Sequence, residues 1–289
     1  MRIAVIGAEG QLGSDLRVRL PGKIIPLDVP AIDVGDESSV GAALGDARPD
    51  LVINCAAMTH VDNCEQQAQL AERVNATGAR HVAQQADALG ASVLYISTDY
   101  VFGAQPARRT AYLEHDMPRP ISVYGHTKLL GEQFTRQACA RHFIVRTCGL
   151  YGHAGALGKG GNFVETICKL AAGENPIRVV ADQRLSPTST LALTEAIAQL
   201  IETDCYGLYH LTAPDNCTWY EFASAIVHSV APGREVVPIP TSEYPTPAAR
   251  PSFSALRSVR AELAGLVPLP GWRAMLDTYL AARRVPGAS

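Results

Sequence analysis

The stretch Arg2-Ile-Ala-Val-Ile-Gly-Ala-Glu-Gly-Gln-Leu-Gly13 opens the chain with a short apolar run that passes directly into three glycines, Gly7, Gly10 and Gly13. A strand that ends in such a loop and opens a helix lets the backbone approach a pyrophosphate, and the helix N-terminus offers free N–H groups to it. The stretch therefore predicts a dinucleotide-binding loop. The alternative is a strand-to-helix turn that needs glycine only for close packing.

A carboxylate follows this loop at the spacing that dinucleotide sites use. Asp28 closes the next apolar run, about 20 residues after Gly7. A carboxylate there accepts both ribose hydroxyls of an adenosine, which favours NADH over a cofactor with a 2′-phosphate. A turn role for Asp28 is the alternative, and Asp33 and Asp36 lie close by in the sequence.

Short apolar runs alternate with helix-like segments through the first half of the chain. The runs at 23–28, 51–54, 92–97 and 143–146 flank long segments without proline. This alternation predicts an α/β fold, a Rossmann-type doubly wound parallel sheet with a smaller C-terminal substrate lobe. We expect residues 1–150 to form the dinucleotide-binding domain, with a returning segment near 188–210. The proline-richer residues 151–289 would form mainly the substrate lobe.

Composition excludes several classes of protein. The 289 residues carry 25 Lys+Arg against 28 Asp+Glu, a net charge of −3, so no basic surplus points to nucleic acid. No apolar run approaches the roughly 20 residues of a membrane helix. The N-terminus reaches Gly7 too soon for a signal peptide, so we expect a cytoplasmic protein. The seven cysteines include no Cys-x-x-Cys pair, and we expect no metal site.

Tyr124 and Lys128 stand four residues apart in a segment expected to be helical, so both side chains share one face. A nearby ammonium favours the phenolate and lowers the pKa of the tyrosine. Tyr124 could then give a proton to a carbonyl oxygen as hydride arrives on carbon, and Lys128 could hold the nicotinamide ribose. Thr98 ends the run before it, where parallel sheets bind ligands. Its hydroxyl could bond that oxygen or Tyr124, with a cap or turn role for Thr98 and Asp99 as the alternative.

In this combination the residues resemble the extended short-chain dehydrogenase/reductases and, more narrowly, the dTDP-4-dehydrorhamnose reductase family. The matching stretches span nearly the whole chain in order: GAEGQLG, RPDLVINCAAMTHVDNCE, VNATGARHVAQ, YISTDYVFGA, VYGHTKLLGE, GNFVETI, DQRLSPT, GLYHLTA, TWYEFA and YPTPAARP. As a set they are specific to this reductase-like group, although not to one substrate.

The resemblance implies reduction of dTDP-4-dehydro-L-rhamnose at C4 to dTDP-L-rhamnose by NADPH or NADH. The family's catalytic residues fall on Tyr124, Lys128 and Thr98. Its cofactor contacts fall on Gly7, Gly10, Gln11, Leu12, Gly13, Asp28, Asp36, Ala56, Ala57, Thr59, Tyr124 and Lys128. Its nucleotide-sugar contacts fall on Thr98, Asp99, Tyr100, Asn162, Phe163 and Arg250. Among these, the Arg250 guanidinium suits two phosphate oxygens.

One departure concerns the sugar pocket. Family members commonly read Arg-Thr-Ser-Trp where this chain reads Arg146-Thr147-Cys148-Gly149, so Gly149 replaces an aromatic that would pack on the sugar. The exact keto-sugar and the stereochemistry at C4 therefore stay open, as does the choice between NADH and NADPH. The oligomeric state is also open, with a homodimer as one candidate.

Two other functions remain as alternatives. The first is a nucleotide-sugar epimerase or 4,6-dehydratase of the same superfamily. Such dehydratases usually carry Asp-Glu after the threonine, whereas this chain carries Asp99-Tyr100. The second is a non-catalytic, cofactor-binding regulatory subunit similar to the β subunit of methionine adenosyltransferase.

Overall fold

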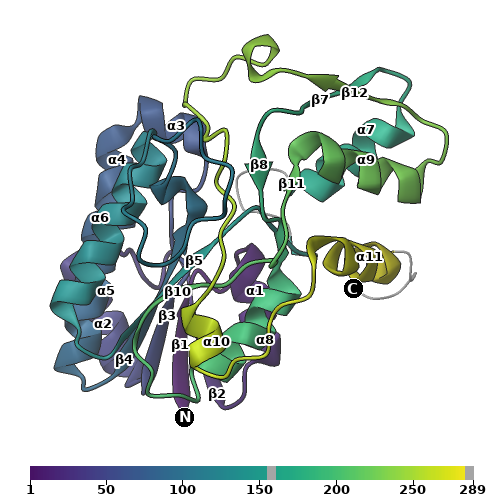
Figure 1. Ribbon diagram of the computed structural model, residues 1–289. Helices are drawn as coiled ribbons and strands as arrows, with labels where there is room; N and C mark the ends of the chain where they lie inside the picture. Colours follow the sequence, from purple (N-terminus) through teal and green to yellow (C-terminus); the bar gives the residue numbers. More distant parts are fainter. Residues whose placement is uncertain (155–160, 284–289) are drawn as a thin grey trace.

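A six-stranded parallel sheet in the order β10-β5-β4-β3-β1-β2 forms the centre of the computed structural model, which describes residues 1–154 and 161–283 (Figure 1). Its strands are β1 (Arg2–Ile6), β2 (Lys23–Leu27), β3 (Leu51–Asn54), β4 (Ser92–Thr98), β5 (His142–Thr147) and β10 (Gly207–His210). The order reverses between β1 and β3, the place where open α/β sheets bind ligands beyond their carboxyl ends. The expected Rossmann-type α/β fold is confirmed.

Helices cover both faces of this sheet (Figure 1). One face carries α2 (Glu37–Ala47), α5 (Gly78–Ala88) and α6 (Val123–Ala138). The other face carries α1 (Gln11–Arg19), α8 (Thr190–Leu200) and the short α10 (Arg260–Leu263). Shorter turns, α3 (Val61–Gln66), α4 (Ala68–Glu72) and the π-helical η1 (Arg73–Thr77), precede α5, and the 3₁₀ turn η2 (Asp99–Val101) follows β4. Because both faces are covered, β3 is buried along its whole length.

The loop between β1 and α1 depends on two of its glycines. Gly7 has φ +76°, a conformation that side chains with a Cβ rarely adopt. A Cβ on Gly13 would lie 2.0 Å from the carbonyl oxygen of Gly7. The loop therefore folds back tightly on the start of α1 and leaves the N-terminus of that helix at the carboxyl edge of the sheet.

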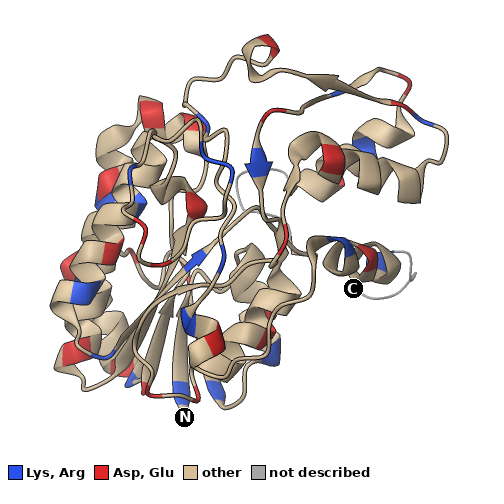
Figure 2. Ribbon diagram, in the orientation of Figure 1, with Lys and Arg blue, Asp and Glu red and all other residues tan. Residues whose placement is uncertain are grey.

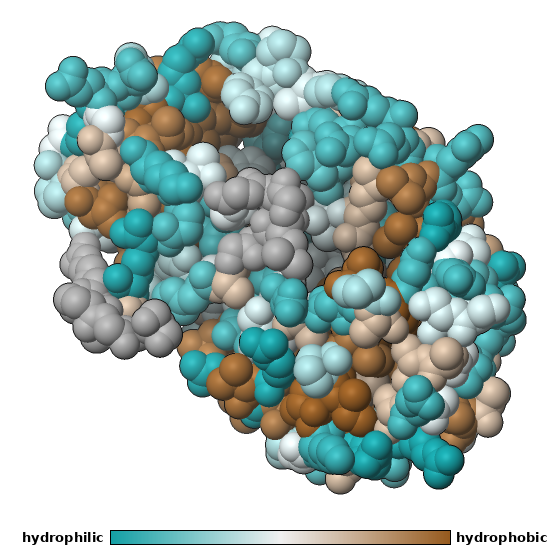
Figure 3. All heavy atoms as spheres, turned by 180° about the vertical axis from the view of Figure 1, so that it is seen from behind, coloured by the Kyte–Doolittle hydropathy of each residue, from teal (hydrophilic) through white to brown (hydrophobic). Residues whose placement is uncertain are grey.

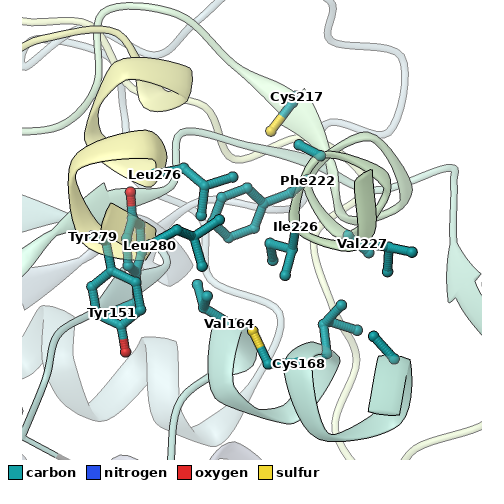
Figure 4. Close-up of a cluster of buried hydrophobic side chains, with 14 of the residues drawn as sticks. Tyr151, Val164, Cys168, Cys217, Phe222, Ile226, Val227, Leu276, Tyr279 and Leu280 are labelled. Carbon is teal, nitrogen blue, oxygen red and sulfur yellow. The ribbon is translucent and has the colours of Figure 1, made fainter. Parts of the chain in front are cut away.

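A second lobe packs around the hydrophobic cluster shown in Figure 4, which includes Tyr151, Phe222 and Leu276. Its helices are α7 (Phe163–Ala172), α9 (Trp219–Val230) and α11 (Trp272–Arg283). Short strands complete it as three pairs: β7 (Ile177–Val180) with β12 (Val236–Ile239), β8 (Arg184–Leu185) with β11 (Cys217–Thr218), and β6 (Leu150–Tyr151) with β9 (Thr188–Ser189). The 3₁₀ turn η3 (Thr241–Glu243) follows β12.

The chain crosses between the lobes more than once. After β9 it returns to the first lobe, where α8 packs on α1 and β10 becomes an edge of the main sheet. After β12 it crosses again. Residues 244–259, the yellow-green part of the chain in Figure 1 that we call the return segment, run back over the first lobe toward α10. Two isolated bridges hold this return segment, Tyr112 to Leu256 and Arg184 to Phe253.

The surface carries charges of both signs. Lys and Arg are interspersed with Asp and Glu over both lobes (Figure 2). Hydrophilic residues cover much of the rear face, with smaller hydrophobic areas between them (Figure 3). Over residues 1–154 and 161–283, no helix has the length and apolar character needed to span a membrane.

A buried ion pair fixes α6 against the sheet. Arg146 of β5 donates from Nε to Glu132 Oε1 at 2.8 Å and from Nη2 to Oε2 at 2.7 Å. Ser97 of β4 donates to Oε1 of the same carboxylate at 2.5 Å. Glu132 therefore joins α6 to two neighbouring strands just below their carboxyl ends.

We predict that Arg146→Met lowers the free energy of unfolding by about 3–5 kcal/mol, because it leaves the Glu132 carboxylate buried without its cation. Urea denaturation measures this loss. The matched control is Arg178→Met, which removes the half-exposed pair with Glu243 and should cost less than about 1 kcal/mol. Equal losses in both variants would contradict a special role for the buried pair.

Candidate active site

A cavity of about 580 Å³ lies between the lobes at the carboxyl end of the parallel sheet. The first lobe lines it with the glycine loop and with residues that follow β2, β3 and β4. The second lobe contributes Gln183, Arg184, Leu185 and Trp219. Its volume lies within the range of about 300–1,000 Å³ that small-molecule sites occupy.

Most of the residues expected to contact a cofactor line this cavity. They are Gly7, Gly10, Gln11, Leu12, Gly13, Asp28, Ala56, Ala57, Thr59, Tyr124 and Lys128. A Cβ on Gly7 would come within 3.2 Å of the Ala56 backbone nitrogen, so the glycine keeps this cradle open. Gln11 donates from Nε2 to the Leu150 carbonyl at 2.9 Å, and its buried Oε1 has no partner among the described residues. These features suit a dinucleotide laid along the loop.

Asp28 lies where the sequence places a ribose-binding carboxylate. It directly follows β2, lines the cavity, and accepts the Glu9 backbone N–H at 3.2 Å on Oδ2. Asp36, also expected at the cofactor, is not among the cavity-lining residues. Its Oδ1 accepts the Ser38 N–H at 3.0 Å and caps α2. Asp33 lines the cavity instead and forms an ion pair with Arg73.

Tyr124 and Lys128 project from the first turns of α6, whose N-cap Ser122 accepts the Gly125 N–H at 3.2 Å. The ring of Tyr124 packs edge-to-face on Tyr100, with centroids 5.7 Å apart. Its side chain lines the same cavity as that of Thr98. Thr98 Oγ1 also accepts the Tyr100 N–H at 3.1 Å. Thr98 therefore caps the η2 turn and faces the cavity at the same time.

The expectation that Lys128 lowers the pKa of Tyr124 is wrong for this structure. Burial raises the pKa of Tyr124, the polar hydroxyl of Thr98 opposes that rise, and the charge of Asp99 adds to it. Lys128 points elsewhere: its Nζ donates to the Ile96 carbonyl at 2.6 Å and lies 4.0 Å from the centroid of the Tyr95 ring. The arrangement holds Tyr124 as a neutral phenol, the form that donates a proton.

Lys128 itself is strongly affected by burial. Its side chain is almost fully buried, and burial lowers its pKa to about 7, with Glu132 and then Cys55 opposing the shift. Near neutral pH the ammonium can therefore lose its proton inside the folded protein.

The residues expected to bind the nucleotide-sugar separate into two groups. Thr98, Asp99 and Tyr100 line the cavity, whereas Asn162, Phe163 and Arg250 are not among its lining residues. Asn162 caps α7, because its Oδ1 accepts the Glu165 N–H at 3.0 Å. Phe163 packs inside the second lobe, with its ring centroid 4.5 Å from that of Trp219.

Arg250 is bound to a carboxylate of this chain. Its Nη1 and Nη2 donate to Asp62 Oδ1 and Oδ2 at 2.6 and 2.8 Å. The hydrogen bond from Arg250 lowers the pKa of Asp62 to about 2. Asp62 also accepts the Ala248 N–H at 3.0 Å. In this structure Arg250 therefore fastens the return segment to α3.

Sequence reasoning missed several residues of the cavity wall. Ser254 and Pro251 come from the return segment, Cys148 follows β5, and Trp219 begins α9. Trp219 packs on Phe163 and also faces the cavity. No local sequence pattern identifies Ser254 as a cavity residue. The bridges of the return segment, which join residues far apart in the sequence, bring it to the site.

Gly149, the departure noted in the sequence, lines the cavity with φ +51°. A Cβ there would lie 2.8 Å from Leu185 Cδ1 and 3.8 Å from the tip of the Trp219 indole. The backbone and its neighbours therefore leave no room for a side chain at this position unless Leu185 moves.

A family model and similar proteins of known name show which family this chain resembles. The family model described as the RmlD substrate binding domain matches residues 1–285. The chain is 38% identical to the spore coat polysaccharide biosynthesis protein SpsK of Bacillus subtilis over 98% of both chains. It is 36% identical to the dTDP-4-dehydrorhamnose reductase of Escherichia coli over 94% of this chain and 95% of that one.

One similar solved structure contains a bound dinucleotide. The dTDP-4-dehydrorhamnose reductase of Bacillus anthracis in complex with NADP superimposes with a TM-score of 0.91 at 39% identity, covering 97% of this chain and 98% of that chain.

We predict that Lys128→Met stabilises the protein most at low pH. Below pH 7 the ammonium is charged in both the folded and unfolded states, so its burial costs the wild type stability. Between pH 7 and about 10 the unfolded chain binds the additional proton, and wild-type stability rises by up to about 1.4 kcal/mol per pH unit. The advantage of the variant in free energy of unfolding should therefore shrink as pH rises from 7 to 10. Urea denaturation at several pH values tests this, and an advantage independent of pH would contradict it.

Proposed function

The chain belongs to the RmlD substrate binding domain family and is similar to dTDP-4-dehydrorhamnose reductases, and we therefore propose that it is an NAD(P)H-dependent nucleotide-sugar 4-ketoreductase. Its substrate would be dTDP-4-dehydro-L-rhamnose and its product dTDP-L-rhamnose. The observation that carries this proposal is the placement of Tyr124, Lys128 and Thr98 in one cavity that the glycine loop also lines.

The side chains divide the work of a carbonyl reduction. When bound, the dinucleotide supplies the hydride. Tyr124, held neutral by burial, gives its proton to the carbonyl oxygen, and the Thr98 hydroxyl in the same cavity holds that oxygen or the phenol in position. Lys128 stands one helical turn further into the cavity wall, where it can reach a ribose hydroxyl once its bond to Ile96 is exchanged.

The dehydratase alternative lacks a group that it needs. Its acid and base would stand directly after the threonine, and here Asp99 is followed by Tyr100, a phenol whose pKa is raised by burial. The regulatory-subunit alternative requires no chemistry, and the assay below separates it from the reductase.

We also propose a cytoplasmic location and a division of labour between the lobes. All seven cysteines are free thiols, which suits a reducing compartment. Residues 1–150 with the returning segment near 188–210 would bind the dinucleotide, and the rest of 151–289 would bind the nucleotide-sugar. A homodimer is the assembly to test first, by sedimentation of the purified protein.

We predict that Tyr124→Phe lowers kcat with dTDP-4-dehydro-L-rhamnose by about 10²–10⁴-fold, because the variant has no proton to give. Absorbance of NADH or NADPH follows the reaction, and calorimetry should show unchanged cofactor binding. The matched control is Tyr206→Phe, which removes a hydroxyl bonded to Asp204 outside the cavity lining and should leave kcat unchanged.

Two results would oppose this assignment. An unchanged rate in Tyr124→Phe would remove Tyr124 from its role. A wild type that binds cofactor but does not reduce the keto-sugar would point to another keto-sugar or to the regulatory alternative, for which a partner enzyme should co-purify.

We predict that Asp28→Ala raises the ratio of kcat/KM for NADPH over NADH by about tenfold, equivalent to about 1.4 kcal/mol. The Asp28 carboxylate accepts ribose hydroxyls and repels a 2′-phosphate. The matched control is Asp36→Ala, which removes a carboxylate that caps α2 outside the cavity lining. If Asp36→Ala shifted the ratio and Asp28→Ala did not, the ribose role would pass to Asp36.

A further inference from the structure

Arg184 is the one basic side chain that the second lobe contributes to the wall of the cavity, among the residues that the structure describes. The other basic residue of the wall is Lys128 of α6, which the proposed function assigns to a ribose hydroxyl of the cofactor. The carboxylates of the wall, Asp28, Asp33 and Asp99, all come from the first lobe. The described part of the second lobe therefore gives the wall a single charge, and that charge is positive.

The backbone of Arg184 is held from both sides. In β8 the residue pairs with Thr218 of β11, and on its other edge it bridges to Phe253 of the return segment. Its N–H donates to the Ser252 carbonyl at 2.9 Å, and its carbonyl accepts the Ser254 N–H at 2.9 Å. The place of this residue at the cavity therefore does not depend on its side chain, and we expect a substitution there to leave the lobe folded.

The side chain of Arg184 is held less firmly. Its Nη1 lies 3.2 Å from Glu221 Oε2 and 3.5 Å from Asn216 Oδ1, and its Nη2 lies 3.3 and 3.1 Å from Glu221 Oε1 and Oε2. Charge-assisted N–H···O bonds usually measure about 2.7–2.9 Å, and the Arg250–Asp62 pair has 2.6 and 2.8 Å. The Arg184 and Glu221 side chains are 35% and 47% exposed, so water competes for both groups. The guanidinium can therefore exchange its partner at little cost.

The proposed substrate needs a cation on this side of the cavity. The cofactor would lie along the glycine loop and the keto group at Tyr124, so the rest of the nucleotide-sugar would extend along the second lobe. Its diphosphate carries negative charge that must be paired when it leaves water. The planar fork of N–H donors in a guanidinium fits phosphate oxygens. Arg250, the candidate from the sequence, is bound to Asp62 and is not among the lining residues.

We propose that Arg184 binds the diphosphate of the nucleotide-sugar and exchanges its Glu221 partner for phosphate oxygens when the substrate enters. This inference rests on the proposed reductase function and deepens it, because it names the cation of the substrate site. No covalent bond changes in this step. Glu221 keeps a partner after the exchange, because its Oε2 accepts the Thr218 N–H at 2.7 Å in the capping box that begins α9.

Isothermal titration calorimetry with dTDP tests the proposal on protein whose cofactor site is first filled with NADP⁺. We expect Arg184→Gln to raise the Kd for dTDP at least about tenfold, because a charge-assisted contact with phosphate is lost. The matched control is Arg178→Gln, which removes a half-exposed arginine that pairs with Glu243 in the same lobe, outside the cavity lining. Its Kd for dTDP should stay within about twofold of the wild-type value.

Thymidine is the matched ligand, because it lacks the phosphates. The Kd for thymidine should be the same in the wild type and in Arg184→Gln. If Arg184 only supported the shape of the site, the substitution would weaken both ligands by the same factor, and the proposal would be overturned. An unchanged Kd for dTDP in Arg184→Gln would also overturn it.

Glu221→Gln tests the exchange of partners. Glutamine keeps an oxygen that can accept the Thr218 N–H, so the capping box can persist. The variant removes the charge that holds Arg184, and we expect the Kd for dTDP to fall about threefold. This gain should disappear in the double variant Arg184→Gln/Glu221→Gln, which has no guanidinium to release. A higher Kd in Glu221→Gln, or a gain that persists in the double variant, would overturn the exchange.

These measurements also separate the inference from the function on which it rests. If the NADP⁺-bound wild type did not bind dTDP, the nucleotide-sugar assignment would fail, and this inference would fail with it. If the wild type bound dTDP and reduced the keto-sugar, but Arg184→Gln bound dTDP equally well, only the role of Arg184 would fail.

Discussion

The buried ion pair between Glu132 and Arg146 is the constraint on which the geometry of the site depends. It joins α6, which carries Tyr124 and Lys128, to β5, and through Ser97 to β4, which ends at Thr98. Tyr124 and Thr98 can face the same part of the cavity only if the helix and the strand keep their relative position. A hydrophobic contact would tolerate a small slide, whereas a two-pronged ion pair with a third donor has one geometry.

The second lobe completes the site through contacts between segments that lie far apart in the sequence. Its residues reach the cavity because the chain crosses between the lobes repeatedly, and the last crossing is held by polar contacts over long sequence separations. Arg250 and Asp62 are 188 residues apart in the chain, yet they fasten the return segment to α3. The bridges at Leu256 and Phe253 flank Ser254 and place it beside Asp99. One wall of the active site thus depends on contacts with no local sequence signal.

This difference explains how far the sequence could predict the structure. The glycine loop, the apolar runs and the Tyr124–Lys128 spacing are local signals, and the Rossmann-type sheet that they predict is the one observed. The placement of Asp36 depended on a competition: a carboxylate before a helix also fits an N-cap, and in the structure it caps α2. Arg250 was chosen for its chemistry with phosphate, but its carboxylate partner could not be read from the sequence. The direction of Lys128 likewise required the end of β4 to be in place.

Residues of both lobes together shape the edge of the cavity at Gly149. With φ +51° the residue occupies a conformation that favours glycine, and Leu185 from β8 lies where a Cβ would project. An aromatic side chain could not be restored there by substitution alone, because the backbone and Leu185 would both have to change. The indole of Trp219 stands at the same edge of the cavity, set by the capping box of Thr218 and Glu221 at the start of α9 and by its packing on Phe163. The aromatic surface on this side therefore comes from the second lobe, so any motion of that lobe changes the shape of the cavity where the sugar would lie.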